Sequence, residues 1–156
     1  MLTGESGARL SLASLRGRPV IVTFIDPLCR DYCPIEAQHL NEVVHALPAA
    51  QRPAIVAVSV NTAGNTRPVL ELDRRKWSLV PEWHWAVGSH AELARVWHAY
   101  GIQVIATTRK IAGIEVRYIG HTEAAYVVDR DGFQRAAFIW PYAASGVIST
   151  LRALSS

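Results

Sequence analysis

The amino-acid sequence predicts an α/β fold with a central mixed β-sheet flanked by helices. Residues 19–25 and 54–60 are continuous runs of mainly β-branched and other apolar residues, as expected for strands buried on both faces. A segment with the apolar spacing of a helix joins them, which implies a right-handed βαβ unit with parallel strands. Near the C-terminus, Arg130-Asp131-Gly132 separates two strand-like segments and predicts a hairpin, so the sheet also contains antiparallel strands.

The first half of the chain contains two strands and two helices in alternation. Residues 9–18 alternate briefly in polarity and end in a glycine-containing turn, and Asp26-Pro27 ends the first buried strand. Residues 33–46 predict a helix because apolar side chains recur at a helical spacing. These side chains are Ile35, Leu40, Val43, Val44 and Leu47. After the second buried strand, Asn65 is a candidate N-cap for a helix over residues 67–77.

The middle of the chain predicts a short strand, a helix and a less regular stretch. Residues 83–87 read as the strand, and Ser89 is the expected N-cap of a helix through Tyr100. Gly101 ends this helix, since glycine adopts the left-handed conformation that commonly follows a helix. Residues 102–119 are less regular, with 114–119 alternating in the manner of an edge strand.

The last part of the chain predicts the hairpin and a closing helix. Residues 123–129 and 134–140 form the hairpin strands, and residues 143–153 have a helical pattern. We find no internal repeat, low-complexity segment or linker, so a single domain over residues 1–156 is expected. The chemistry is expected at the carboxyl end of the first central strand, where open α/β sheets place their sites.

The composition is that of an ordinary globular domain. The chain has 156 residues, 50% of them hydrophobic and 19% charged, which is enough to bury a core without disulfide bonds. The formal net charge of +3 arises from arginines scattered along the chain. Nucleic-acid binding is not expected, because a basic patch interleaved with groups that contact bases is absent from the sequence.

The N-terminal sequence contains neither a membrane span nor a signal peptide. No segment approaches the ~20 apolar residues that cross a bilayer. The first ten residues also lack the apolar core of a signal peptide. Met1 lies only about one turn ahead of the first expected strand, whereas natural N-termini usually have more residues before the first element. We therefore favour a chain that is the soluble part of a longer, anchored protein over a cytosolic protein.

The two cysteines, Cys29 and Cys33, are better explained by chemistry than by folding. Three residues separate them, so a bond between them would close a very small loop and add little stability. Four positions apart on a helix, they would share a face with Cβ atoms ~5–6 Å apart, which suits a disulfide or one metal ion. A helix N-terminus also favours the thiolate, the form that attacks and that binds metals. The polar neighbours Arg30, Asp31 and Tyr32 argue against two buried, purely structural cysteines.

Two soft sulfur atoms are an incomplete site for most metals, and histidine is a suitable third ligand for copper. Five of the six histidines are expected to be structural or surface residues. These are His39, His45, His84, His90 and His98. His121 differs because it follows Gly120 and immediately precedes the strand 123–129, which places it in a loop at a sheet end. If that strand lies beside the one that contains Phe24, His121 faces the cysteine turn.

The order of these motifs resembles the Sco/SenC family over nearly the whole chain. The matching features are the strand ending at Phe24, residues 29–34 (CRDYCP), residues 59–61 (SVN) and residues 120–132 (GHTEAAYVVDRDG). The most specific feature is Cys-x-x-x-Cys-Pro combined with a distant histidine just before a Tyr-Val-Val-Asp strand. Members of this family are thioredoxin-like, copper-binding proteins that help assemble the dinuclear copper centre of cytochrome c oxidase.

The resemblance implies a thioredoxin-like fold with Cys29, Cys33 and His121 as copper ligands. The implied partners are the copper-site subunit of cytochrome c oxidase or another copper acceptor, together with a thiol reductant. Family members are normally tethered by an N-terminal helix and face the periplasm or cell exterior, so an extracytoplasmic location is expected. Asp31 matches an acidic residue that the family often keeps between the cysteines, where it would tune the charge of the site or face a partner.

Four residues depart from the family pattern. Arg30 stands where the family usually has proline, Asn61 where it usually has aspartate, and Asp26-Pro27 where Tyr-Thr is more typical. These differences spare the three implied ligands but alter the surface around them. They fit a divergent branch of the family and leave the copper acceptor open between the usual one and another protein.

Two functions from different classes fit the cysteine pair. In a copper chaperone, two thiolates and an imidazole hold Cu(I) or Cu(II) and pass it on by ligand exchange with thiolates of a partner. In a thiol–disulfide oxidoreductase, Cys29 attacks a disulfide and Cys33 resolves the intermediate. Typical reductases use Cys-x-x-Cys and a facing proline, in place of which this chain has His121-Thr122, so the chaperone is favoured. A peroxidatic cysteine is rejected, since Asp26 and Val22 stand where threonine and proline are needed.

Overall fold

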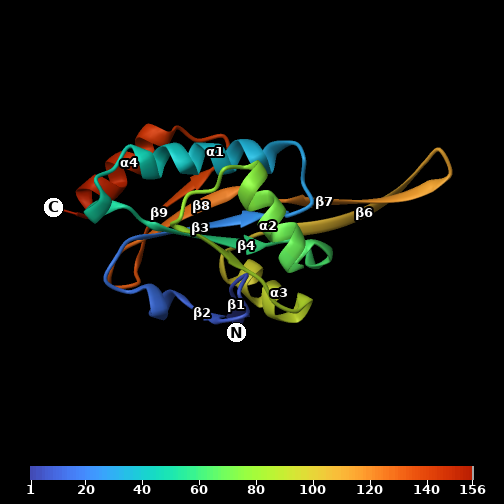
Figure 1. Ribbon diagram of the computed structural model, residues 1–156, viewed down its shortest axis with the longest axis horizontal. Helices are drawn as coiled ribbons and strands as arrows, with labels where there is room; N and C mark the ends of the chain where they lie inside the picture. Colours follow the sequence, from blue (N-terminus) through green and yellow to red (C-terminus); the bar gives the residue numbers. More distant parts are fainter. Residues whose placement is uncertain (156) are drawn as a thin grey trace.

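The computed structural model describes residues 1–155 and shows a central five-stranded sheet with helices on both faces (Figure 1). The strand order is β5-β4-β3-β8-β9. The strands are β3 (Val20–Ile25), β4 (Ala54–Ser59), β5 (Trp83–Ala86), β8 (Ala124–Val128) and β9 (Gln134–Ile139). The first three are parallel, β8 is antiparallel to β3, and β9 is antiparallel to β8. The predicted α/β fold with a mixed sheet is confirmed.

Four α-helices cover the two faces of the sheet unequally. On one face lie α1 (Tyr32–His45), α2 (Arg67–Lys76) and α4 (Ala144–Ala153), while α3 (His90–Ala99) lies on the other. None of the helices in residues 1–155 combines the length and the apolar character that crossing a membrane requires.

Short elements complete the N-terminal and connecting segments. The strands β1 (Leu2–Thr3) and β2 (Arg9–Leu10) pair with each other, and Thr3 bridges to Val87 next to β5. Single 3₁₀ turns lie between larger elements. They are η1 (Leu12–Leu15), η2 (Ala49–Gln51) and η3 (Thr62–Gly64).

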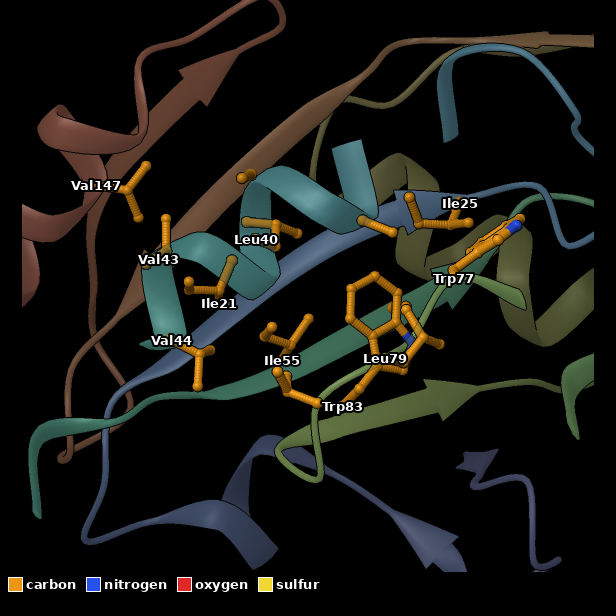
Figure 2. Packing of buried hydrophobic residues seen from close by; sticks show 14 of the residues in the cluster. Ile21, Ile25, Leu40, Val43, Val44, Ile55, Trp77, Leu79, Trp83 and Val147 are labelled. Carbon is orange, nitrogen blue, oxygen red and sulfur yellow. The ribbon is translucent and has the colours of Figure 1, made fainter. Parts of the chain in front are cut away.

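The core consists of one hydrophobic layer on each face of the sheet. Successive side chains of a strand point to opposite faces, so in β3 Ile21 and Ile25 pack in the layer under α1, whereas Val22 packs in the layer under α3. Figure 2 shows the first layer, with Leu40 of α1 close to β3 and β4. Burying each such side chain contributes about 1.5–3 kcal/mol, which explains the uninterrupted apolar runs of the central strands.

The ends of two helices test the predicted caps. Ser89 caps α3 through a reciprocal capping box with Glu92, and Gly101 follows the helix with φ of 69°, as predicted. The prediction for Asn65 is wrong. Thr66 occupies the N-cap position of α2, while the Asn65 side chain donates to the carbonyl of Gly88 at 3.4 Å. Asn65 is therefore used in a long-range contact instead of a local cap.

A long hairpin replaces the irregular stretch predicted for residues 102–119. Strands β6 (Val104–Ile111) and β7 (Ile114–His121) pair along their full length and extend away from the central sheet (Figure 1). Ala112 and Gly113 both have positive φ, at 47° and 85°, which suits a tight hairpin turn between twisted strands. The alternation at residues 114–119 marked part of β7, whereas β6 was missed because its middle, residues 107–110 (TTRK), is polar and exposed.

Candidate metal centre

The loop between β3 and α1 carries both cysteines at the carboxyl end of the central strands. Asp26 shapes this loop from its first position, since its Oδ1 accepts the backbone N–H of Leu28 at 2.8 Å. Its main-chain oxygen accepts the N–H of Cys29 at 3.0 Å and closes a turn. The Asn61 side chain, from the end of the neighbouring strand, donates to the same Asp26 Oδ1 at 3.0 Å. The backbone before Cys29 is therefore held to the sheet.

Cys29 and Cys33 lie on different elements. The helix α1 begins at Tyr32 with Asp31 as its N-cap, so Cys33 is in the first turn and Cys29 is in the preceding loop. The expectation that both cysteines share one helix face is wrong, because the turn closed by Asp26 runs through Cys29 before helical hydrogen bonding starts. Both are free thiols; Cys29 is half-buried, whereas only 1% of Cys33 is exposed.

The two thiols differ strongly in acidity. The pKa of Cys29 is lowered to about 5, mainly because the side chain of Cys33 donates a hydrogen bond to its sulfur. Backbone N–H groups of Cys33, Asp31 and Tyr32 at the start of α1 add to this effect. The pKa of Cys33 is raised, first by that same hydrogen bond and then by burial. At neutral pH the pair therefore consists of a Cys29 thiolate and a protonated Cys33.

His121 reaches Cys33 from a distant part of the chain. Its Nε2 lies 3.9 Å from Sγ of Cys33, and its Nδ1 lies 3.0 Å from the carbonyl oxygen of Thr122. A carbonyl oxygen only accepts, so Nδ1 carries the proton and Nε2 directs its lone pair towards the sulfur. The sequence suggested that His121 lies in a loop, but His121 is the last residue of β7. The predicted approach follows from the antiparallel pairing of β8 with β3.

Glu123 is a member of this cluster that the sequence analysis missed. Ligand atoms of Cys33, His121 and Glu123 all lie within 4.8 Å of one another. Side chains two positions apart in extended backbone point to the same side, so the spacing between His121 and Glu123 was the available signal. The carboxyl is half-buried, and its pKa is raised by burial. Sulfur, nitrogen and oxygen donors therefore converge on one point.

The cluster opens into a cavity of about 470 Å³ between the cysteine loop and the hairpin. Its walls include Asp26, Cys29, Asn61, Tyr118 and Glu123. Asp31 lines the cavity as well, and its side chain makes no hydrogen bond to the start of α1. The base of β7 thus forms one wall of the site, and the cysteine loop forms the opposite wall.

Arg30, between the cysteines, points to the helix layer. Its guanidinium donates to the carbonyl oxygens of Pro27 at 3.0 Å and Cys29 at 2.8 Å. It also lies 3.5 Å from the carboxylate of Asp73 on α2, whose side chain is completely buried. Arg30 therefore bridges two carbonyl groups within the cysteine loop and connects this loop to α2.

The other five histidines lie outside the cluster. His39 is half-buried against the rings of Trp140 and Tyr142, with centroids 5.5 and 5.4 Å away, and His90 packs on Trp97 at 5.4 Å. His45 and His98 are exposed, and His84 is half-buried on β5. Across residues 1–155, none of these side chains belongs to a group of three or more potential metal ligands.

A buried carboxyl group lies in the same layer, one helical turn beyond Cys33. Glu36 is fully buried; its Oε1 accepts hydrogen bonds from Thr23 Oγ1 at 2.7 Å and Tyr142 Oη at 3.3 Å. Its Oε2 has no partner among the described residues. Burial raises the pKa of Glu36 to about 7. Nothing in the local sequence marks Glu36 as buried, because a glutamate on a predicted helix is ordinarily exposed.

Comparisons with known proteins agree on one family and one fold. A family model described as SCO1/SenC matches residues 1–155. The copper-bound structure of Bradyrhizobium japonicum ScoI has a TM-score of 0.82 and 24% identity, covering 98% of this chain and 95% of the other. For copper-bound Arabidopsis thaliana ScoI the values are 0.85 and 17%, with 99% and 94% covered. A SCO1/SenC family lipoprotein from Bacillus anthracis has a TM-score of 0.77 and 15% identity, with 99% and 92% covered.

The structural matches establish a thioredoxin-like fold, as the resemblance had implied. Among curated protein sequences, none matches this chain significantly.

Proposed function

The chain belongs to the SCO1/SenC family, and from this premise we propose that it is a Sco-type copper chaperone. Cys29, Cys33 and His121 are the proposed ligands. The observation that supports this most directly is the 3.9 Å approach of His121 Nε2 to Cys33 Sγ, between residues 88 positions apart. The copper-bound relatives with the same fold support the choice of metal.

The geometry of the donors suits a single small metal ion. A sulfur about 2.3 Å and a nitrogen about 2.0 Å from one ion lie roughly 3.5–3.7 Å apart at trigonal or tetrahedral angles. The observed separation is therefore close to that of a loaded site. Thiolates and imidazole are ligands that copper prefers, and hydrogen bonding of Nδ1 to Thr122 holds the imidazole in the tautomer that binds through Nε2.

Ligand exchange provides a route for copper transfer. Cys29 is more exposed than Cys33 and lies on the wall of the open cavity, so a thiolate of a partner can replace it first. Cys33 and His121 then retain the ion until the partner supplies further ligands. We propose the dinuclear copper site of cytochrome c oxidase, or another extracytoplasmic copper protein, as acceptor.

The residues that depart from the family pattern lie in or against the loop that carries the cysteines. Asn61 bonds to Asp26, and Arg30 spans from the cysteine loop to Asp73. They change how the loop is held and leave the three proposed ligands in place. We therefore propose a divergent Sco branch, and the lipoprotein relative supports an extracytoplasmic, membrane-tethered location.

A second candidate function is thiol–disulfide exchange with one dedicated partner. The low pKa of Cys29, about 5, favours it because a half-exposed thiolate is a competent nucleophile. In that reaction Cys29 attacks a partner disulfide and forms a mixed disulfide. Cys33 then attacks the Cys29 sulfur and releases the partner thiolate. Two electrons pass to the partner, which leaves as a dithiol, while Cys29 and Cys33 become a disulfide.

Copper titrations of the reduced protein separate the two functions. We expect the wild type to bind one Cu(I) or one Cu(II), and His121→Ala to weaken both by at least about tenfold. His98→Ala is the matched control, since His98 is exposed on α3 and outside the cluster. If His121→Ala leaves both affinities unchanged while reduction of a disulfide substrate persists, the chaperone proposal is wrong.

A further inference from the structure

Glu123 adds an oxygen atom to the proposed sulfur and nitrogen donors. Its carboxylate, the Nε2 side of His121 and the Cys33 sulfur lie within 4.8 Å of one another, so one ion can contact all three after small side-chain movements. The carboxylate makes no hydrogen bond or ion pair with another side chain in residues 1–155. It is a half-buried acidic group that faces His121 and Cys33 and forms no ion pair with a cationic side chain in residues 1–155.

The backbone holds His121 and Glu123 in a fixed relation. Between them, the N–H of Thr122 donates to the carbonyl of Gln103 at 3.0 Å, and the hydroxyl of Thr122 accepts the N–H of Gln103 at 3.2 Å. The carbonyl of Glu123 accepts the N–H of Trp140 at 3.0 Å. Residues that flank β6 and β9 therefore restrain this segment. The two side chains, two residues apart, are kept on the side that faces the cysteines.

The carboxylate oxygen of Glu123 is a harder ligand than the two thiolate sulfurs and the imidazole nitrogen. Cu(I) prefers soft ligands and few of them, which the two thiolates and the imidazole already supply. Cu(II) prefers square-planar or tetragonal sites that include nitrogen and oxygen ligands. The charges also favour Cu(II) as the ion that the carboxylate binds. Two thiolates and a carboxylate leave one net negative charge around Cu(II) but two around Cu(I). In a partly buried site the second arrangement is less favourable.

We propose that Glu123 is a fourth copper ligand that binds Cu(II) and not Cu(I), so that it sets the preference of the site between the two oxidation states. This inference rests on the proposed copper function and assigns to it a residue outside the Cys29, Cys33 and His121 set. Cu(II) is held by two sulfurs, one nitrogen and one oxygen. Cu(I) is held by the two sulfurs and the nitrogen, with the carboxylate turned to the cavity.

The test compares Glu123→Gln with the wild type in both oxidation states. Affinities are measured by competition with chelators of known strength, using the reduced protein. We expect Cu(II) binding to weaken by about 10-fold or more and Cu(I) binding to change by less than about twofold, since losing even an indirect metal contact commonly costs 10–100-fold. A tenfold selective loss raises the potential of the bound copper couple by about 59 mV. The Cu(II) electron paramagnetic resonance spectrum is expected to change as well.

Two further variants separate coordination from charge and from folding. Glu115→Gln removes the same charge from the exposed part of β7 and is expected to leave both affinities unchanged. Glu123→Asp keeps the charge but shortens the side chain by one methylene, so it is expected to weaken Cu(II) binding and alter the spectrum. It also serves as the test if Glu123→Gln does not fold, which circular dichroism would show.

Failure of this inference is distinguishable from failure of the proposed function. If wild type and His121→Ala behave as expected but Glu123→Gln shifts both affinities equally, or neither, Glu123 is not a Cu(II) ligand. A Cu(II) spectrum that is unchanged in Glu123→Gln and Glu123→Asp would equally exclude Glu123 as a ligand. If the wild type binds no copper, the proposed function itself is overturned.

Discussion

Arg30 Nη1 lies 3.5 Å from Oδ1 of Asp73, so a residue between the two cysteines forms an ion pair with a buried carboxylate on a different helix. The Asp73 side chain is completely buried and has no hydrogen bond within residues 1–155 that would replace this contact. Burial raises the pKa of Asp73 to about 6, and the charge of Arg30 opposes that rise. The position of the cysteine loop and the ionisation of a core carboxyl are therefore linked.

Replacing Arg30 by glutamine is expected to destabilise the protein. The variant removes the charge that opposes the rise in the pKa of Asp73, so the buried carboxyl loses its ion-pair partner, at a cost of about 1–3 kcal/mol. The free energy of unfolding, measured in urea, is expected to fall by that amount. In the double variant Arg30→Gln/Asp73→Asn most of the loss is expected to be recovered, because no buried charge remains. Arg67→Gln, which breaks an exposed pair with Glu71, serves as control and is expected to have little effect.

Gly64 controls the placement of the cysteine loop from the opposite side. A Cβ atom at this position would stand 2.8 Å from Cβ of Pro27 and 3.1 Å from Cγ of Leu28, the two residues before Cys29. Gly64→Ala is therefore expected to displace the loop, reduce the free energy of unfolding by about 1–3 kcal/mol and weaken copper binding. Gly4→Ala is the matched control, since its nearest atoms are 3.7 and 3.8 Å away. Equal behaviour of the two variants would contradict the prediction.

The two thiols are expected to react at very different rates. Alkylation of the wild type by iodoacetamide, followed by mass spectrometry of peptides, should modify Cys29 with a midpoint near pH 5 and leave Cys33 almost unmodified. In Cys33→Ala the midpoint for Cys29 is expected to move to higher pH, because the hydrogen bond that contributes most to its low pKa is lost. A midpoint that is the same in both proteins would show that the helix start alone lowers the pKa.

Glu36 is expected to make stability depend on pH. Its folded pKa of about 7 lies above the ordinary value of 4.5, so the folded state binds this proton more tightly than the unfolded state does. The stability contributed by the protonated carboxyl is complete below about pH 4.5 and is lost as the pH rises towards 7 and above. Glu36→Gln stays neutral and keeps an oxygen that can accept from Thr23.

The difference in unfolding free energy between Glu36→Gln and the wild type isolates this effect from other titrating groups. It is expected to grow in favour of the variant by on the order of 3 kcal/mol between pH 4.5 and pH 8. Urea unfolding at several pH values measures it. A difference that does not change with pH would mean that folding does not shift the pKa of Glu36.

Local patterns were sufficient for most of the fold. The run that forms β3 was predicted to within one residue, because a strand buried on both faces must be apolar throughout. The capping box of Ser89 also acts over a few residues and could be read directly. Where a residue acts over a distance, the local pattern was misleading. Asn65 has the chemistry of a cap, but its side chain bonds to Gly88, 23 positions later in the chain.

The sequence by itself determined the α/β fold, the cysteine pair and the choice of His121 among six histidines, because strand runs, residue spacing and the match to a family pattern are properties of the linear chain. Only the tertiary structure decided that Cys29 lies before the helix, that β6 and β7 form a hairpin and that Glu123 joins the cluster. The physical reason is that the pairing of β8 with β3, and the hydrogen bonds around residues 121–123, bring these donors together across 88 or more positions. No local sequence pattern encodes a contact between residues so far apart in the chain.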